Sequence, residues 1–261
     1  MKWHRVKALL LKCYYLTINS PDRLCDMFYW PLIDLFVWGF ASFYIKDISD
    51  VNVLSALLGG IILWVFVWRS SQDIAVYVLE DFWGKNLYHL FSSPVRFSEH
   101  LLSIITFSFF RALASGTFMA LIASLLYSFS LFSFSPLVVG LSIFLLSLFG
   151  WTTGLFVTAL IFRFGQRIQV LAWSTVWIIQ PFSCVFYPLS SLPVWGQWIA
   201  RLLPTTYIFE NMRAMMLGHP VDYSTYAISF IISMIFFGIG LVVVHWSFQS
   251  ARKMGMLEKG D

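Results

Sequence analysis

Two charged side chains stand inside long apolar stretches of this sequence, and they are its first candidates for chemistry. Asp34 lies near the middle of the apolar run 27–45, and Arg111 lies about a third of the way into the run 101–134. Charged groups inside a bilayer are costly, so they commonly pair with one another or mark the path of a substrate or an ion. Arg111 could contact an anionic substrate, pair with Asp34 or extend to the membrane surface, and Asp34 has similar alternatives.

Reagents for catalysis are missing from the sequence. It contains no HExxH or GxSxG motif and no paired carboxylates within an apolar run, so hydrolysis has no candidate residues. A phosphate-binding loop is also missing, because Gly84 and Lys85 are followed by Asn86 and no glycine stands five residues before Gly84. The three cysteines have neither metal-ligand nor CxxC spacing. We therefore expect no catalytic residue, no metal and no bound cofactor, and conclude that the chain is not an enzyme.

The elements that position these residues are membrane helices. The 261 residues are 59% hydrophobic and 11% charged, and the apolar runs are long enough to cross a hydrocarbon core of about 30 Å. Helices satisfy their own backbone groups in lipid. We predict an all-α integral membrane fold, in a single domain over 1–261, with six transmembrane helices at about 27–45, 51–68, 101–134, 136–162, 168–187 and 226–246. The third run is longer than a bilayer core and must tilt, protrude or end in a loop before Pro136.

Lysine and arginine positions predict the orientation. With the N-terminus inside, the inner segments carry thirteen of these residues and the outer connections carry three, while Arg111 lies within a helix. Cytoplasmic loops retain positive charge, so both termini are expected in the cytoplasm. The net charge of +4 forms no basic patch interleaved with aromatic residues in a soluble module, and we expect no nucleic-acid partner.

Residues 1–20 are too charged to span a membrane. A stripe recurs at three- and four-residue spacing, made of Trp3, Val6, Leu10, Cys13 and Thr17. This spacing suits a helix lying in the cytoplasmic interface. The alternative is a basic tail that only obeys the charge rule. Within the fourth span, Gly150 and Gly154 form a GxxxG pattern that would permit close helix approach, or that occurs by chance.

The connection 78–100 is predicted to form a brief helix along the membrane surface. Its apolar residues are Phe82, Leu87, Leu90 and Phe91, and Pro94 ends it. Glu80 and Asp81 would stand at its start, where the helix dipole favours acids. A simple amphipathic linker is the alternative.

The outer connection 187–217 is predicted to hold two short helices. Trp195, Trp198, Ile199 and Leu202 follow the i, i+3, i+4, i+7 pattern after Pro193, and Pro204 ends this helix. A second segment, 206–217, carries Glu210 and Arg213 at a spacing that permits an ion pair. We expect a re-entrant helical hairpin near the outer surface, with an interfacial loop anchored by tryptophans as the alternative.

At these two connections the chain resembles the permeases of the type-2 ATP-binding-cassette transporters, a family that includes exporters of drugs, lipo-oligosaccharide and polysaccharide. The resemblance runs over nearly all of the chain. The inner motif, an acid followed by Asn-Leu and Ser-Pro, matches Glu80, Asn86, Leu87, Ser93 and Pro94. The outer motif matches Pro188, Leu192, Pro193, Pro204, Glu210 and Arg213.

The resemblance implies that residues 78–96 act as a coupling helix that docks on a separate cassette ATPase. The coupling residues would be Glu80, Asp81, Gly84, Asn86, Leu87, Phe91, Ser93 and Pro94. It further implies a permease homodimer with two ATPase copies that carry ATP and Mg²⁺, in contact with lipid of a bacterial plasma (inner) membrane.

Two other classes remain alternatives. An ion-coupled secondary transporter needs a relay of titratable groups, and Asp34 alone is a poor relay; inverted halves with broken helices are not evident either. The second alternative class is a polytopic membrane protein that has no ATPase partner. Loss of transport on removing a partner ATPase would separate the permease from both.

Overall fold

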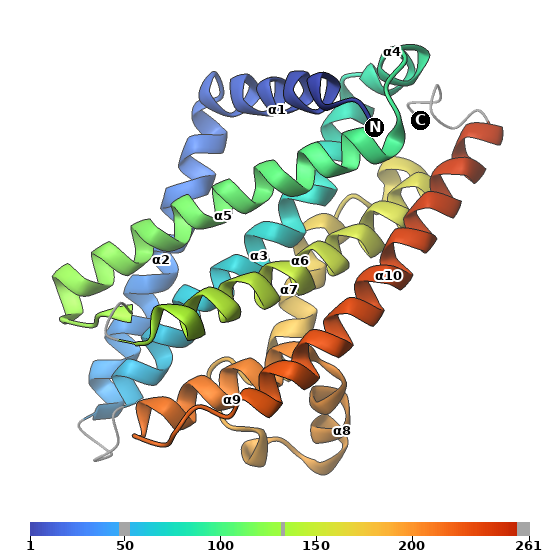
Figure 1. The fold of residues 1–261 in the computed structure, drawn as a ribbon. Coiled ribbons are helices and arrows are strands. Elements are labelled where there is room, and N and C mark those ends of the chain that lie inside the picture. The colour runs from blue at the N-terminus through green and yellow to red at the C-terminus, as the bar shows by residue number, and fades with distance from the viewer. Residues whose placement is uncertain (47–52, 132–133, 255–261) are drawn as a thin grey trace.

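The computed structural model describes residues 1–46, 53–131 and 134–254, and this part of the chain is helical without a β-strand (Figure 1). The helices are α1 (Trp3–Ile18), α2 (Pro21–Lys46), α3 (Val53–Trp83), α4 (Asn86–Ser92), α5 (Phe97–Tyr127), α6 (Pro136–Phe164), α7 (Leu171–Ile179), α8 (Val194–Leu202), α9 (Pro204–Met216) and α10 (Tyr223–Lys253). Short 3₁₀ turns, Gly165–Ile168, Gln180–Phe182 and Leu189–Ser191, join the helices of the second half.

Five of the described helices are long and apolar enough to cross a membrane: α2, α3, α5, α6 and α10. The all-α membrane fold predicted from the sequence is therefore confirmed. The apolar run 101–134 ends its helix at Tyr127, and Ser128 follows in a left-handed conformation with φ of 54°, so a loop does separate α5 from Pro136. The predicted span 168–187 is not one of the five helices.

The segment that should form this remaining span is a broken helix beside α3. Helix α7 has nine residues and is followed by a 3₁₀ turn at Pro181. The ring of Trp173 stacks on that of Trp83 with centroids 6.4 Å apart, and Trp177 lies 6.5 Å from Trp68. The chain thus runs antiparallel to α3 in this region. Six crossings stay a prediction.

Helix α3 is the central element, and it continues well beyond the predicted end at residue 68. The expected polar connection from Arg69 onward is wrong, because the helix runs on to Trp83. Five consecutive polar residues of α3 are buried: Arg69, Ser70, Ser71, Gln72 and Asp73. Helices α2, α5, α6 and α7 pack around α3. Asp26 of α2 and Arg111 of α5 are the ionic partners of Arg69 and Asp73, so the polar stretch remains helical. Because Arg69 lies inside α3, the inner connections contain twelve basic residues and not the thirteen counted from the sequence.

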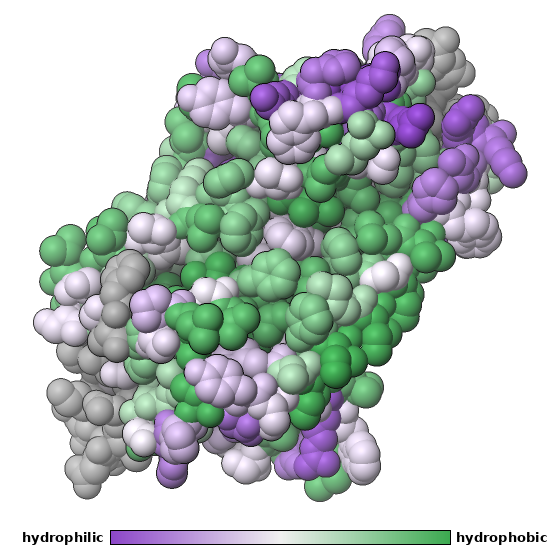
Figure 2. All heavy atoms as spheres, in the orientation of Figure 1, coloured by the Kyte–Doolittle hydropathy of each residue, from purple (hydrophilic) through white to green (hydrophobic). Residues whose placement is uncertain are grey.

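Helix α1 lies across one end of the bundle, beside α4, whereas α8 and α9 lie at the other end (Figure 1). Its buried residues are Val6, Leu9, Cys13 and Thr17. Val6, Cys13 and Thr17 belong to the predicted stripe, but Trp3 is 57% exposed. Figure 2 shows a band of hydrophobic side chains across the middle of this face, with hydrophilic ones gathered at the α1–α4 end.

The GxxxG pattern of α6 lies against α3. A Cβ atom added at Gly150 would be 2.6 Å from the carbonyl oxygen of Val67, and one at Gly154 would be 2.7 Å from the carbonyl oxygen of Ser71. These positions need glycine because the two backbones approach closely. The sequence left open whether this pattern permits close helix approach or occurs by chance. The structure shows close helix approach.

Candidate functional site

Helix α4 is attached to the α1–α4 end by a few apolar contacts. Leu87 is 1% exposed and packs into a core cluster with residues of α3, α5 and α6. The ring of Phe91 lies 4.7 Å from that of Phe248 in α10, and the hydroxyl of Ser93 donates to the carbonyl of Leu90 at the end of the helix. The residues at its start are exposed: Gly84, Lys85 and Asn86. The turn before α4 and the first residue of the helix therefore face outward.

Glu80 and Asp81 lie in the last turn of α3, so their predicted place at the start of the short helix is wrong. Asp81 is 3% exposed. It accepts a hydrogen bond from Lys12 of α1, and its other oxygen lies 3.4 Å from Nε2 of His100 in α5. Glu80 Oε1 is 2.7 Å from Nη2 of Arg23 in α2. Basic side chains from other helices thus hold both acids, and α3 can extend through them.

A second set of contacts joins α1 to the turn after α4. The carbonyl of Pro94 accepts a hydrogen bond from Arg5. The buried carboxylate of Glu99 accepts from the backbone N–H groups of Lys2, at 2.7 Å, and Arg96, at 3.0 Å. We call the contacts of Arg5 and Lys12 with this region the α1 latch.

The α1 latch was not predicted from the sequence, which led us to treat Arg5, Lys12 and Arg23 as orientation charges only. A signal was present, because Glu80, Asp81 and Glu99 needed cations if any of them was buried. Only the tertiary structure shows which cation each acid has.

Arg111 pairs with Asp73 of α3, so the pairing with Asp34 that we considered is wrong. Arg111 Nη1 lies 2.7 Å from Asp73 Oδ1, and Arg111 is 7% exposed, which also excludes extension to the surface. Asp26 of α2 lies 2.5 Å from Arg69 Nη1 and 3.9 Å from Arg111 Nη2. The two arginines and two aspartates form a network between α2, α3 and α5, in which all but Asp26 are buried.

The outer connection folds into two short helices at the predicted places. Pro193 precedes α8, and Pro204 is the first residue of α9, where proline's missing N–H costs no helical hydrogen bond. Pro188 and Leu192 flank the 3₁₀ turn before α8. A re-entrant position in the membrane stays a prediction.

Glu210 and Arg213 form the ion pair that their spacing suggested, with 2.6 Å between Arg213 Nη1 and Glu210 Oε1. Glu210 also accepts from the backbone N–H of Leu189 at 2.9 Å, and Arg213 donates to the carbonyl of Cys184 at 2.8 Å. Through these hydrogen bonds the pair links α9 to the segment between α7 and α8.

The apolar face of α8 points away from the rest of the chain. Trp195, Trp198 and Leu202 are each more than 60% exposed, while Gly196 and Ala200 are buried. Tryptophans on such a face are typical of membrane–water interfaces.

Of the three cysteines, Cys13 and Cys184 are packing residues, whereas Cys25 is exposed. Both of these packing side chains are buried. Burial raises the pKa of the Cys13 thiol to about 12, so this thiol stays protonated at neutral pH. Among the described residues, no three or more His, Cys, Asp and Glu residues are grouped so that they could hold a metal ion.

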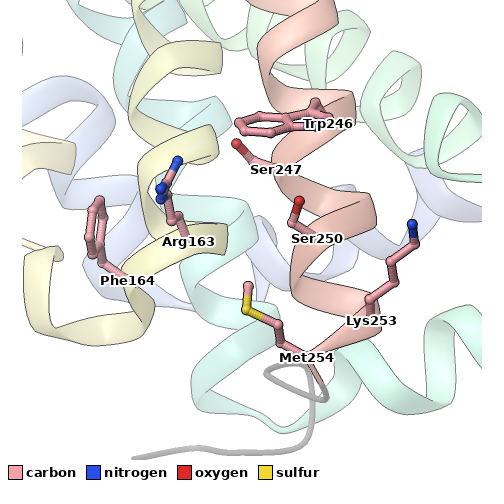
Figure 3. A pocket seen from close by; sticks show the side chains of 7 residues that line it. All are labelled: Arg163, Phe164, Trp246, Ser247, Ser250, Lys253 and Met254. Carbon is pink, nitrogen blue, oxygen red and sulfur yellow. The ribbon is translucent and has the colours of Figure 1, made fainter.

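A hollow of about 470 Å³ lies between the ends of α6 and α10 near the α1–α4 end. Figure 3 shows Arg163 of α6 across from Trp246, Ser247 and Ser250 of α10, with the guanidinium 6.0 Å from the Trp246 ring centroid. Lys253 extends from the other side of α10 (Figure 3), so the two cations do not converge on one point.

Comparison with known proteins gave one family. The family described as ABC-2 type transporter matches residues 5–217, which include α1, the α4 connection and the hairpin α8–α9. No curated protein matches the chain.

Proposed function

Because the chain belongs to the ABC-2 type transporter family and is a permease component of such a system, we propose that it is the membrane-spanning subunit of an exporter driven by a separate cassette ATPase. The observation that carries the proposal is α4, a short helix with an exposed start that buried residues attach to the bundle. ATP and Mg²⁺ would bind to the partner, since this sequence lacks a phosphate-binding loop.

In this proposal the α1–α4 end faces the cytoplasm of a bacterial cell, and the α8–α9 end faces outward across the plasma (inner) membrane. Twelve basic residues in the inner segments against three in the outer ones support this orientation. The exposed tryptophans of α8 would then lie at the outer interface, in contact with lipid.

The contacts of α4 suggest how a movement of the ATPase reaches the membrane. Leu87 transmits it to the cluster that includes α3, and Phe91 transmits it to α10. The α1 latch would make α1 move together with the turn at Pro94, because Arg5 is hydrogen-bonded to the carbonyl of Pro94. Two permease chains with two ATPase copies would form the path, and nucleotide-driven closure of the ATPases would open it outward.

Cross-linking tests the proposal. With endogenous cysteines replaced by serine, Asn86→Cys should form a bismaleimide cross-link to the cassette ATPase co-expressed with the chain. Leu87→Cys is the matched control: it is the adjacent residue, but its side chain is buried, so it should cross-link weakly. Trp195→Cys, at the opposite end, should not cross-link.

Two results would overturn the proposal. One is an efficient cross-link from Trp195→Cys with none from Asn86→Cys, which would invert the orientation. The other is transport by the reconstituted chain without any ATPase, which would favour an ion-coupled transporter.

A further inference from the structure

A cavity of about 450 Å³ opens on the flank of the bundle, between α2, α3 and α7. Its lining combines four tryptophans with two carboxylates and one amide: Trp30, Trp68, Trp173, Trp177, Asp26, Asp34 and Gln72, together with Ile33. Trp68 is 8% exposed at the floor, whereas Trp30 and Trp177 are 53% and 50% exposed at the rim. The opening therefore lies on the side of membrane-spanning helices and not at either end.

Asp34 leaves this region with one uncompensated negative charge. Arg69 pairs with Asp26 at 2.5 Å and Arg111 pairs with Asp73 at 2.7 Å. Among the residues that the structure describes, Asp34 has no cation within 4.0 Å. Three carboxylates thus face two guanidinium groups, and the carboxylate without an ion pair lies in the cavity.

Two groups of the lining, the carboxylate of Asp34 and the Oε1 atom of Gln72, are free to accept hydrogen bonds from a ligand. A carboxylate is an acceptor only. Gln72 is 6% exposed, and its Oε1 has no hydrogen-bond partner within the described chain. A buried acceptor without a partner is costly, so a ligand that donates N–H groups would be stabilised here.

The aromatic rings favour a cation as well. The face of an indole attracts positive charge, and the protein already uses one ring of this cavity in that way: the Arg69 guanidinium lies 4.7 Å from the centroid of Trp68. Trp30 and Trp177, each about half exposed, are open to a second cation. Their large apolar surfaces would also bury the hydrocarbon part of such a ligand.

We propose that this cavity binds a lipophilic ammonium, with its N–H groups on Asp34 and Gln72 and its apolar body among the tryptophans. The assignment of this amine as transported cargo rests on the proposed function, whereas the binding site itself does not. An anion would meet the uncompensated carboxylate and is excluded.

Binding to the purified full chain, without any ATPase, tests the site. Radiolabelled 4-phenylbutylamine should bind at pH 7.5 at least tenfold more tightly than the neutral 4-phenylbutanol, measured by competition. Asp34→Asn should lose at least tenfold in affinity for the amine and almost none for the alcohol. Asp222→Asn, an acid at the start of α10, is the matched control and should bind as the unchanged chain does.

A second variant tests the site without relying on Asp34→Asn, which could lose binding because it misfolds. Trp177 is half exposed, so Trp177→Leu should leave the thermal unfolding temperature nearly unchanged and still weaken amine binding several-fold. Equal affinity for amine and alcohol, or full binding by folded Asp34→Asn, would overturn the site.

The same ammonium chemistry occurs in the headgroup of phosphatidylethanolamine. Binding of the amine in phosphatidylglycerol nanodiscs that is lost when phosphatidylethanolamine is added would assign the site to this lipid. Unchanged binding would assign it to a free amine. Because no ATPase is present, failure here leaves the cross-link from Asn86→Cys intact, and failure of that cross-link leaves the amine site intact.

Discussion

At the scale of single residues, the buried charges of this protein are held by partners from other helices. Arg111 and Asp73 come from α5 and α3, and the atoms of the pair are 2.7 Å apart with both side chains nearly inaccessible. In such a site, removing one partner leaves the other charge uncompensated, which costs more than the pair contributes.

We predict that Arg111→Met lowers the free energy of unfolding by about 3–5 kcal/mol. The double variant Arg111→Met with Asp73→Leu should recover a large part of this loss, because no unpaired charge remains. Urea unfolding in detergent is measured for the unchanged chain, for Arg111→Met, for Asp73→Leu and for the double variant. A double variant as damaged as the sum of the two single ones would show that the charges do not act as a pair.

The α1 latch provides a second prediction at this scale. Lys12→Gln removes the cation on Asp81 and should increase amide hydrogen exchange across α1, because the helix loses its ion pair with this buried carboxylate. Lys7→Gln is the matched control, since Lys7 is an exposed residue of the same helix. Equal exchange in the two variants, measured by mass spectrometry, would mean that the latch does not hold α1.

At the scale of elements, close contact between α6 and α3 defines the centre of the bundle. Gly150 and Gly154 place the α6 backbone against carbonyl oxygens of α3. A side chain at either position requires the helices to separate, and strain of this kind typically costs about 1–3 kcal/mol.

Gly150→Ala and Gly154→Ala should therefore each lower the thermal unfolding temperature of the purified protein. Gly140→Ala is a control in the same helix, because a Cβ there meets nothing within 4 Å. It should be neutral or stabilising by about 0.5–1 kcal/mol, the usual gain of alanine over glycine in a helix. The interpretation fails if all three variants behave alike.

At the scale of the whole molecule, the distribution of charge predicts which end faces the cytoplasm. Lys85 lies before α4 and Lys253 ends α10, whereas Trp195 lies in α8. In inside-out vesicles, Lys85→Cys and Lys253→Cys should react with a membrane-impermeant maleimide, and Trp195→Cys should react only in right-side-out vesicles. The reverse pattern would refute the orientation.

Composition, apolar run lengths and turn residues were enough to determine the broad architecture of this protein from its sequence. The apolar runs predicted membrane helices, Pro193 and Pro204 marked the two ends of α8, and the spacing of Glu210 and Arg213 predicted their ion pair. These features are local, and hydrophobicity, proline geometry and helical periodicity act over a few residues.

Only the tertiary structure decided how the polar residues are used. The stretch from Arg69 to Asp73 resembles a loop by composition, yet it is the buried middle of α3. Its helical state depends on Asp26 and Arg111, which lie tens of residues away along the chain. A charge is tolerated inside a membrane protein when a distant helix supplies its partner, and sequence spacing carries no record of that pairing.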